Sequence, residues 1–254
     1  MIVFLLFILG LCIGSFLNVV IDRLPGGQTL RGRSKCDHCG KTLDAKDLIP
    51  LFSYLILGGE CRYCHKKISI QYPIVEFLTG VIFILVYAMF GLSLTPFGLA
   101  IFILRLILYS TLICIFVIDL KLRIIPDELI IIITVIAIIM RFIEGSLGWE
   151  AVLSGLSLFL IFLVLYILTR GRGMGMGDVK YALVMGFFLG FPKVVIGFYT
   201  AFLTGALVSI ILILRGKKRF GQTIAFGPFL VFATVVADIW GNTLWVYFQR
   251  IIGI

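Results

Sequence analysis

The chain has 254 residues, of which 61% are hydrophobic and only 14% are charged, and its mean hydropathy is +1.16. A single water-soluble core cannot bury so much apolar surface, so the composition excludes a soluble globular protein and predicts an all-α polytopic membrane protein. The net charge of +9 is explained by basic loops that orient the chain and attract anionic lipids, and it does not indicate nucleic-acid binding.

Apolar runs along the chain predict about eight transmembrane helices. The sixth run is short for a bilayer about 30 Å thick. The third run contains Arg105, a charge that must face the protein interior or reach toward the membrane surface. The expected spans are residues 1–21, 73–90, 96–118, 129–143, 152–169, 179–190, 194–214 and 224–248.

The distribution of basic residues predicts the orientation. The first run has no basic residue before it and no cleavage pattern of small residues after it, so we expect an uncleaved helix with its N-terminus outside. In that orientation 18 of the 22 lysines and arginines lie in inner loops, counting Lys180 at the edge of one loop. The positive-inside rule therefore places four loops in the cytoplasm, namely residues 22–72, 119–128, 170–178 and 215–223.

The first span contains Gly10 and Gly14, a pair of small residues suited to close helix packing, and Asn18, which can hydrogen-bond across helices. Packing is the role expected for all three. Glu76 lies about one turn inside the second span, where an ionised carboxylate is costly unless it has a partner or lines a wet cavity. A functional role and simple pairing with a basic loop residue both remain open for Glu76.

The loop at residues 22–72 carries two Cys-x-x-Cys pairs separated by 21 residues. This spacing allows four thiolates to surround Zn²⁺, and four cysteine ligands leave no open position for catalysis, so the metal would fold the loop as a small zinc-ribbon-like domain. Disulfides, a redox pair or a cluster are alternatives, although a reducing cytoplasm argues against disulfides. His38 and His65 lie beside the pairs and could replace a cysteine. The expected ligands are Cys36, Cys39, Cys61 and Cys64.

Two carboxylates stand at the ends of different spans. Asp119 ends the third span, where a basic residue is the usual ending, whereas Asp127 begins the next helix and needs no role beyond the helix dipole. Asp178 follows the glycine-rich residues 171–177 and begins an apolar helix, so it could cap that helix or supply chemistry. The glycines also allow another backbone to approach closely, so a substrate could lie there.

Asp119 and Asp178 are expected on the same face of the membrane, where helix packing could bring them together. Two carboxylates that share a site cannot both ionise cheaply, so such a pair holds a proton near neutral pH. The ionised member can accept a proton from water while the protonated member polarises a peptide carbonyl. The pattern therefore predicts aspartyl proteolysis.

Two other classes of function are alternatives to proteolysis. A transporter could use a charge relay formed by Glu76, Arg105, Asp119 and Asp178. The sequence, however, shows no convincing internal repeat or paired broken helices. A non-enzymatic membrane adaptor could bind a partner through its zinc ribbon, but it leaves the glycine-rich loop and its carboxylate unexplained.

Taken in order, the motifs resemble those of bacterial type IV prepilin peptidases, which are membrane aspartyl proteases with a Gly-x-Gly-Asp motif. The resemblance extends over nearly the whole chain. It rests on the doubled Cys-x-x-Cys and on residues 14–18, 23–25, 72–76, 118–119, 125–127, 175–180 and 226–229.

The resemblance implies cleavage of the basic leader peptides of prepilins or pseudopilins, after a glycine, at the cytoplasmic face of the bacterial inner membrane. It assigns catalysis to Asp119 and Asp178 and makes Asp127 the less fitting catalyst. Gly175 and Gly177 would support the substrate or loop beside Asp178, and Lys180 would pair with an aspartate or with phospholipid.

The resemblance also implies methylation of the new N-terminal amine from S-adenosylmethionine, because members with a long cysteine-bearing loop are commonly bifunctional. The sequence has no glycine-rich Rossmann fingerprint after a strand, which excludes a soluble-type methyltransferase fold. The expected methylation region is the zinc loop with Glu76 and Gly80. The chain would thus divide into a first helix (1–21), a cytoplasmic zinc-binding domain with four cysteine ligands (22–72) and a membrane peptidase domain with about seven helices (73–254).

Overall fold

The computed structural model describes residues 1–171, 173–216 and 225–252. Arg172 of the glycine-rich stretch and most of the basic loop expected at residues 215–223 lie outside the described residues, as does the expected start of the last span at residue 224.

The described residues form nine α-helices, two 3-10 turns (Leu24–Gly26 and Ala45–Asp47) and two isolated β-bridges. This confirms the all-α class. The helices are α1 (Ile2–Arg23), α2 (Phe52–Ile56), α3 (Gln71–Phe90), α4 (Pro96–Leu122), α5 (Asp127–Ile143), α6 (Trp149–Leu168), α7 (Met176–Leu189), α8 (Lys193–Leu214) and α9 (Gly227–Ile252).

Each of the eight expected spans coincides with a helix, but the helices differ in length. Six in the described part of the chain, α1, α3, α4, α6, α8 and α9, are long and apolar enough to cross a membrane. The other two, α5 and α7, have 17 and 14 residues. At 1.5 Å per residue they reach about 26 Å and 21 Å, less than the roughly 30 Å of a hydrocarbon core. The chain is therefore a multi-pass membrane protein with six full-length span candidates.

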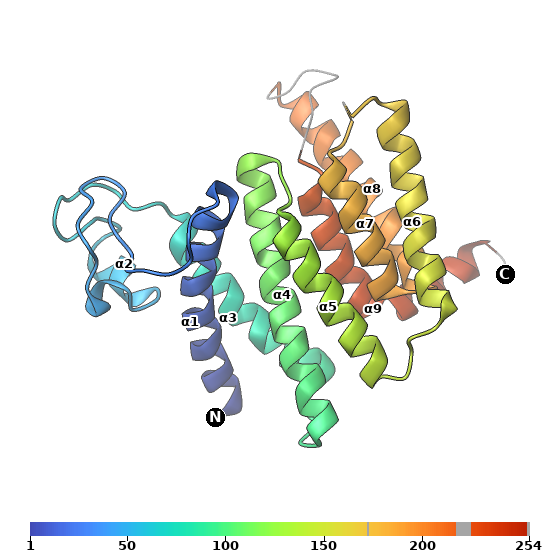
Figure 1. The fold of residues 1–254 in the computed structure, drawn as a ribbon, viewed down its shortest axis with the longest axis horizontal. Coiled ribbons are helices and arrows are strands. Elements are labelled where there is room, and N and C mark those ends of the chain that lie inside the picture. The colour runs from blue at the N-terminus through green and yellow to red at the C-terminus, as the bar shows by residue number, and fades with distance from the viewer. Residues whose placement is uncertain (172, 217–224, 253–254) are drawn as a thin grey trace. The chain divides into compact units, whose positions relative to one another are not determined.

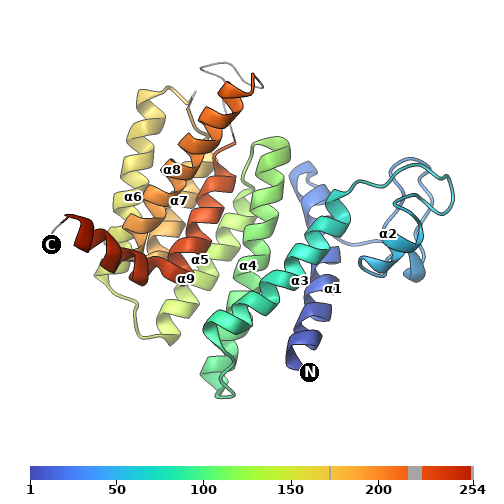
Figure 2. The ribbon, with the colours of Figure 1, turned by 180° about the vertical axis from the view of Figure 1, so that it is seen from behind.

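The structure divides into two compact units, an N-terminal unit (Met1–Cys114) and a C-terminal unit (Ile115–Ile254). In the N-terminal unit α1 and α3 lie side by side, as both views show (Figures 1 and 2). A Cβ atom placed on Gly10 would lie 2.6 Å from the Cα of Gly80, and one on Gly14 would lie 2.6 Å from the Cα of Glu76. The predicted packing through small residues is confirmed, because only glycine permits helices this close.

Polar groups also join the helices of the N-terminal unit. The Asn18 amide donates hydrogen bonds to the carbonyl of Tyr72, at 3.1 Å, and to the carbonyl of Gly14, at 3.3 Å, as expected for a residue that links helices. Further along, the guanidinium carbon of Arg105 lies 3.6 Å from the ring centroid of Phe90. A cation over an aromatic face is a favourable way to hold a charge inside a membrane protein.

In the C-terminal unit α7 is the central helix. It contacts α5, α6, α8 and α9, and nine of its 14 residues are buried. A Cβ atom on Gly186 would lie 2.6 Å from the Ser154 carbonyl oxygen of α6, so the two helices pack closely. Contacts with four neighbouring helices hold α7 in place, and its first turn carries Asp178.

Candidate active site and metal centre

Asp119 lies in the last turn of α4, because this helix continues to Leu122, four residues beyond the expected end of the span. Its side chain is buried, and its Oδ2 accepts a hydrogen bond of 3.0 Å from the backbone N–H of Gly227. Gly227 is the first residue of α9. A free N–H group at a helix start, with the positive end of the helix dipole, favours a negatively charged carboxylate.

Gly227 is a site residue that the sequence reasoning missed. A Cβ atom at this position would lie 2.7 Å from Oδ2 of Asp119 and 2.9 Å from its Cγ. Only glycine therefore allows the start of α9 to approach this carboxylate. The signal was the Gly-Pro pair at a helix start, which the sequence analysis interpreted only as part of a signature.

Asp178 is the third residue of α7 and is also buried. Its Oδ2 accepts a hydrogen bond of 2.9 Å from the N–H of Gly175, and its own N–H donates to the Gly175 carbonyl at 3.2 Å. Gly175 is thus the N-cap residue, and Asp178 reaches back to it from the first turn. Asp178 is therefore not the N-cap residue itself, although its carboxylate does accept an N–H group at the helix start. Its burial exceeds what a surface cap requires.

Asp178 precedes the segment expected to enter the membrane, residues 179–190. Burial raises the pKa of its carboxyl group to about 7, and the negative charge of Asp119 adds to the rise against the opposing hydrogen bond from Gly175. The two acids therefore interact electrostatically across 59 positions of sequence. A carboxyl group with a pKa near 7 is protonated about half of the time at neutral pH.

The glycine-rich loop meets the segment that follows Asp119. A Cβ atom on Gly177 would lie 3.2 Å from the Cβ of Ile125, so this contact favours a glycine. At Gly175, by contrast, an added Cβ atom would have only two atoms within 4 Å. They are Oδ2 of Asp178, at 3.7 Å, and the backbone nitrogen of Gly177, at 3.9 Å. Packing among the described residues therefore does not require glycine at position 175, which is exposed.

Lys180 and Asp127 form an exposed ion pair in which the ammonium nitrogen lies 2.8 Å from both carboxylate oxygens. Of the two partners expected for Lys180, the structure thus shows the aspartate. Asp127 is also an acid of the first turn of α5, as expected for a charge that favours the helix dipole. Its ion pair with Lys180 is a second role, which the sequence did not indicate.

The four cysteines of the loop come together. Their sulfur atoms all lie within 4.8 Å of one another, and those of Cys36 and Cys64 are 3.9 Å apart. Tetrahedral coordination at the usual Zn–S length of about 2.3 Å would separate two sulfurs by roughly 3.8 Å. The thiols are free, and 3.9 Å is far longer than a disulfide bond. The cluster, which also includes Cys39 and Cys61, could hold a metal ion.

The two cysteine pairs have similar backbone turns. Gly40 and His65, each one residue after a pair, have positive φ angles of 70° and 56°, and each donates a backbone hydrogen bond to the first cysteine of its pair. His65 therefore serves the turn, and neither it nor His38 belongs to the group of candidate ligands.

Glu76 lies buried in α3 and forms a hydrogen bond with the cysteine loop. Its Oε2 accepts a hydrogen bond of 2.8 Å from the backbone N–H of Leu51, just before α2. Leu51 has a φ angle of 60°, which is unfavourable for a residue other than glycine, so the bond holds a strained turn. Gly80, the other residue of the expected methylation region, packs against Gly10 and the ring of Phe7.

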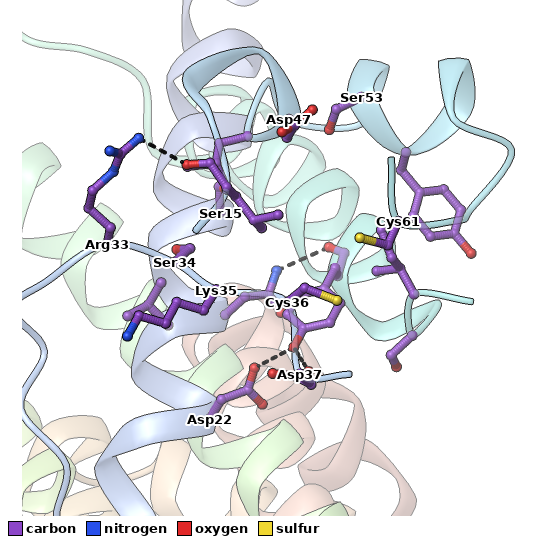
Figure 3. Close-up of a pocket in the computed structure, with 18 of the residues that line it drawn as sticks. Ser15, Asp22, Arg33, Ser34, Lys35, Cys36, Asp37, Asp47, Ser53 and Cys61 are labelled. Carbon is purple, nitrogen blue, oxygen red and sulfur yellow. Dashed lines mark hydrogen bonds between the residues drawn. The ribbon is translucent and has the colours of Figure 1, made fainter. Parts of the chain in front are cut away.

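Glu76 also lines a cavity of about 1270 Å³ in the N-terminal unit. The end of α1, the cysteine loop and the start of α3 form its walls (Figure 3). On one wall the Tyr72 hydroxyl donates to Asp22 Oδ2 at 2.9 Å and lies 3.4 Å from Asp37 Oδ2. Figure 3 shows Arg33 and Lys35 apart from these carboxylates. The cavity thus presents both signs of charge, and no sequence pattern indicated it.

Comparison with known proteins identifies the family. The profile of the Bacterial Peptidase A24 N-terminal domain matches residues 8–90, and that of the Type IV leader peptidase family matches residues 106–210. No solved structure matches the chain.

Curated relatives match over nearly the full length. A prepilin leader peptidase/N-methyltransferase of Bacillus subtilis (strain 168) is 32% identical over 94% of this chain and 95% of its own. Proteins of the same name from Aeromonas hydrophila and Neisseria gonorrhoeae are 33% and 31% identical, over 94% of this chain and 91% and 90% of theirs. The chain therefore belongs to the bacterial type IV prepilin leader peptidase/N-methyltransferase family.

Proposed function

We propose that this protein removes the basic leader peptides of prepilins or pseudopilins by cutting after a glycine, and that it then methylates the new N-terminal amine. The observation that carries the proposal is the buried, electrostatically coupled pair Asp119 and Asp178. It occurs in a chain about one third identical to prepilin leader peptidase/N-methyltransferases.

The surroundings of the two acids suggest different roles for them. Asp178, with a pKa raised to about 7, holds the shared proton. Asp119, which accepts the N–H at the start of α9, is the ionised member. Asp119 takes a proton from water, the water oxygen attacks the peptide carbonyl carbon, and Asp178 donates its proton to the carbonyl oxygen. Asp119 then passes the proton that it took from water to the nitrogen and the C–N bond breaks. A hydroxyl of the intermediate returns a proton to Asp178, which leaves the carboxyl end of the leader and a new amine.

The glycine-rich loop would present the substrate to these acids. The exposure of Gly175 supports this role, because a residue without a side chain lets a peptide backbone approach it closely. Gly177 keeps the loop against Ile125, and the ion pair of Lys180 with Asp127 holds the neighbouring helix starts together.

We place the N-terminus outside the bacterial inner membrane and the cysteine loop and both acids on the cytoplasmic side. The support is the concentration of basic residues in the loops assigned to the inside. These loops would also contact anionic lipids. A basic leader would then stay inside while the apolar part of a prepilin enters the bilayer, which positions the cut bond at the inner boundary.

The cysteine cluster would bind structural Zn²⁺. Support comes from the sulfur separations and from the choice of four cysteines, which leaves no position open for a substrate. In functional terms, residues 22–72 then form a metal-binding domain inserted between α1 and the peptidase domain of residues 73–254.

Methylation would follow cleavage, with S-adenosylmethionine as the donor. The support is the name that the full-length relatives share. When bound, the donor supplies a methyl group on a positively charged sulfur. The amine nitrogen forms a bond to the methyl carbon, the carbon–sulfur bond breaks with its electron pair going to sulfur, and the nitrogen loses one proton.

The direct test incubates the purified full-length protein in detergent with a prepilin, first alone and then with S-adenosylmethionine. We expect a gel shift from loss of the leader, a new N-terminus directly after glycine, and a mass gain of one methyl group only when the donor is present. A prepilin left intact by well-folded protein contradicts the peptidase proposal, and a product that is cut but never methylated contradicts the second activity.

A further inference from the structure

We infer that residues 48–56, which comprise α2 and the residues leading into it, form an interfacial anchor that lays an apolar face into the edge of the lipid bilayer beside α1 and α3. The partner of this surface is the bilayer itself. The inference goes beyond the two proposed activities and depends on neither, because it concerns how the cysteine loop is held against the membrane.

The short helix α2 has a different environment on each of its two sides. Ser53 and Leu57, one helical turn apart, both line the cavity of the N-terminal unit. Phe52, Leu55 and Ile56 have the spacing of the opposite face and are 60%, 72% and 79% exposed. One side of α2 is therefore used within the protein, whereas the other presents large apolar side chains to the outside.

The residues before α2 extend the same apolar surface. Leu48 and Ile49 are also exposed, and the N–H of Ser53 donates to the Ile49 carbonyl at 3.0 Å, which joins Ile49 to the first turn of α2. Exposed large hydrophobic side chains thus occur at five of the nine positions from 48 to 56. Such a concentration marks an interaction surface, because scattered exposed apolar residues are ordinary but gathered ones are costly in water.

The depth of α2 follows from its place beside the two spanning helices. Leu51, the residue before α2, donates its N–H to Glu76, the sixth residue of α3. Ser53 borders the same cavity as Ser15, which precedes the end of α1 at Arg23 by eight residues, or about 12 Å along the helix. Figures 1 and 2 show α2 at a level between the two ends of α1. It lies beside the spanning helices and not beyond them.

At this level both helices change from apolar to polar. Residues 2–14 of α1 are all apolar or glycine, and Ser15 is the first polar residue of the helix. In α3, Glu76 directly precedes the uncharged stretch of residues 77–90. This change marks the boundary between hydrocarbon and water. An amphipathic helix at that boundary buries its apolar face about 5–10 Å into the lipid.

The lipid bilayer is the occupant that the surroundings favour. Exposed aromatic side chains stand on both spanning helices at the same level, at Phe16 and Phe77, so a lipid-facing surface adjoins the anchor. Lys46 is exposed in the 3-10 turn that contacts α2, where its charge can meet lipid phosphates. The cavity lies on the opposite side of α2, so a peptide bound there would not cover this face.

The experiment places the photoreactive amino acid benzoylphenylalanine at position 55 of the full-length protein, in place of Leu55. The protein is reconstituted into vesicles of phosphatidylethanolamine and phosphatidylglycerol, with a prepilin present, and illuminated. Mass spectrometry then identifies the molecules that the label has captured. Metal content and the circular dichroism spectrum verify that each labelled protein is folded, and position 56, in place of Ile56, serves as a second labelling site on the same face.

Position 30 is the matched control. Leu30 is an exposed leucine of the same loop. The Arg23 side chain donates to the carbonyls of its neighbours Thr29 and Arg31, at 3.4 and 3.2 Å, so Leu30 is held near the end of α1. The same label on the same type of residue is thus compared at the depth of α2 and at the end of the spanning helix.

We expect adducts with lipid acyl chains at positions 55 and 56, at a yield several-fold above that at position 30. Equal yields at the three positions, or no lipid adduct at 55 and 56 in folded protein, would overturn the inference. Capture of the prepilin or of a second copy of the chain in place of lipid would also overturn it, because the face would then bind protein. The readout is independent of cleavage and methylation, so its failure leaves both proposed activities standing.

Discussion

At the scale of single residues, the candidate site consists of two acids whose carboxylates accept hydrogen bonds from backbone N–H groups. Asp119 meets the first N–H of α9, and Asp178 meets the N–H of its own N-cap residue, Gly175. Both carboxylates are buried. Each contact is made by a backbone N–H group, which fixes the orientation of the carboxylate.

Gly227 should therefore be sensitive to the smallest substitution. In Gly227→Ala the new methyl group would lie 2.7 Å from Asp119 Oδ2 and must displace that carboxylate. Because a shift of about 1 Å in a reacting group can cost about a hundredfold in rate, we expect leader cleavage to fall by that order. Gly26→Ala is the control, since a Cβ there meets nothing closer than 3.8 Å. Wild-type cleavage by Gly227→Ala would contradict this role.

The rate of cleavage should also depend on pH in a stated direction. The raised pKa of Asp178, about 7, means that the pair keeps its shared proton below pH 7 and loses it as the pH rises through 7. Cleavage requires that proton, so kcat/KM should decline with a midpoint near pH 7 on the alkaline side. Circular dichroism across the same range separates this effect from unfolding. A rate that does not decline at about two pH units above this midpoint would contradict the assignment.

At the scale of elements, the cysteine loop joins two helices that pack through glycines. Gly10 and Gly14 bring α1 against α3, and Glu76 in α3 binds Leu51 of the loop. Because these two helices pack closely, they fix the positions of the two ends of the loop. The four cysteines then gather the middle of the loop, which has little regular structure of its own.

Removal of the metal should loosen this loop. We expect Cys36→Ser and Cys61→Ser to lose the roughly one zinc ion per chain of the wild type, measured by elemental analysis, and to expose the loop to trypsin. Cys12→Ser is the control, because Cys12 is an exposed residue of α1 outside the cluster. Unchanged metal content and trypsin resistance after replacement of all four cluster cysteines would remove the argument for zinc.

The helices and the cysteine cluster could be predicted because their signals are local. Apolar runs determine where spans lie, and the spacing of the two Cys-x-x-Cys pairs by itself indicates a site with four metal ligands. The ends of the helices were less predictable. Asp119 was expected to end the third span but lies inside α4, because the helix continues to Leu122.

Contacts between distant residues could not be predicted in this way. Gly227 reaches Asp119 across 108 positions, and Leu51 reaches Glu76 across 25. Nothing in the periodicity of either segment encodes its partner. The cavity is also absent from any sequence pattern, because its walls come from two helices and an irregular loop.

At the scale of the whole molecule, the structure separates into two compact units that carry different candidate chemistry. The acid pair belongs to the C-terminal unit, and the cavity and the cysteine cluster belong to the N-terminal unit. The two family profiles also match separate stretches, residues 8–90 and 106–210. Cleavage and methylation should therefore be separable by substitution.

The short helix α7 determines where Asp178 lies. The central helix α7 has only 14 residues, about 21 Å of rise, and is buried among its neighbours. The packing of α7 against its neighbours keeps Asp178, in its first turn, buried. This burial raises the pKa of the Asp178 carboxyl group, and Gly175 and Gly177 lie beside it.

The most direct measurement of the central claim is the rate of leader cleavage by Asp119→Asn, Asp178→Asn and Asp127→Asn. Asparagine preserves size and can still accept the backbone hydrogen bonds, but it cannot hold the shared proton. We predict that the first two variants lose at least about a thousandfold in rate while remaining folded in the membrane. Asp127→Asn, which breaks an exposed ion pair and removes one acid from the first turn of α5, should cut like the wild type. Wild-type cleavage by Asp119→Asn or by Asp178→Asn would contradict the account.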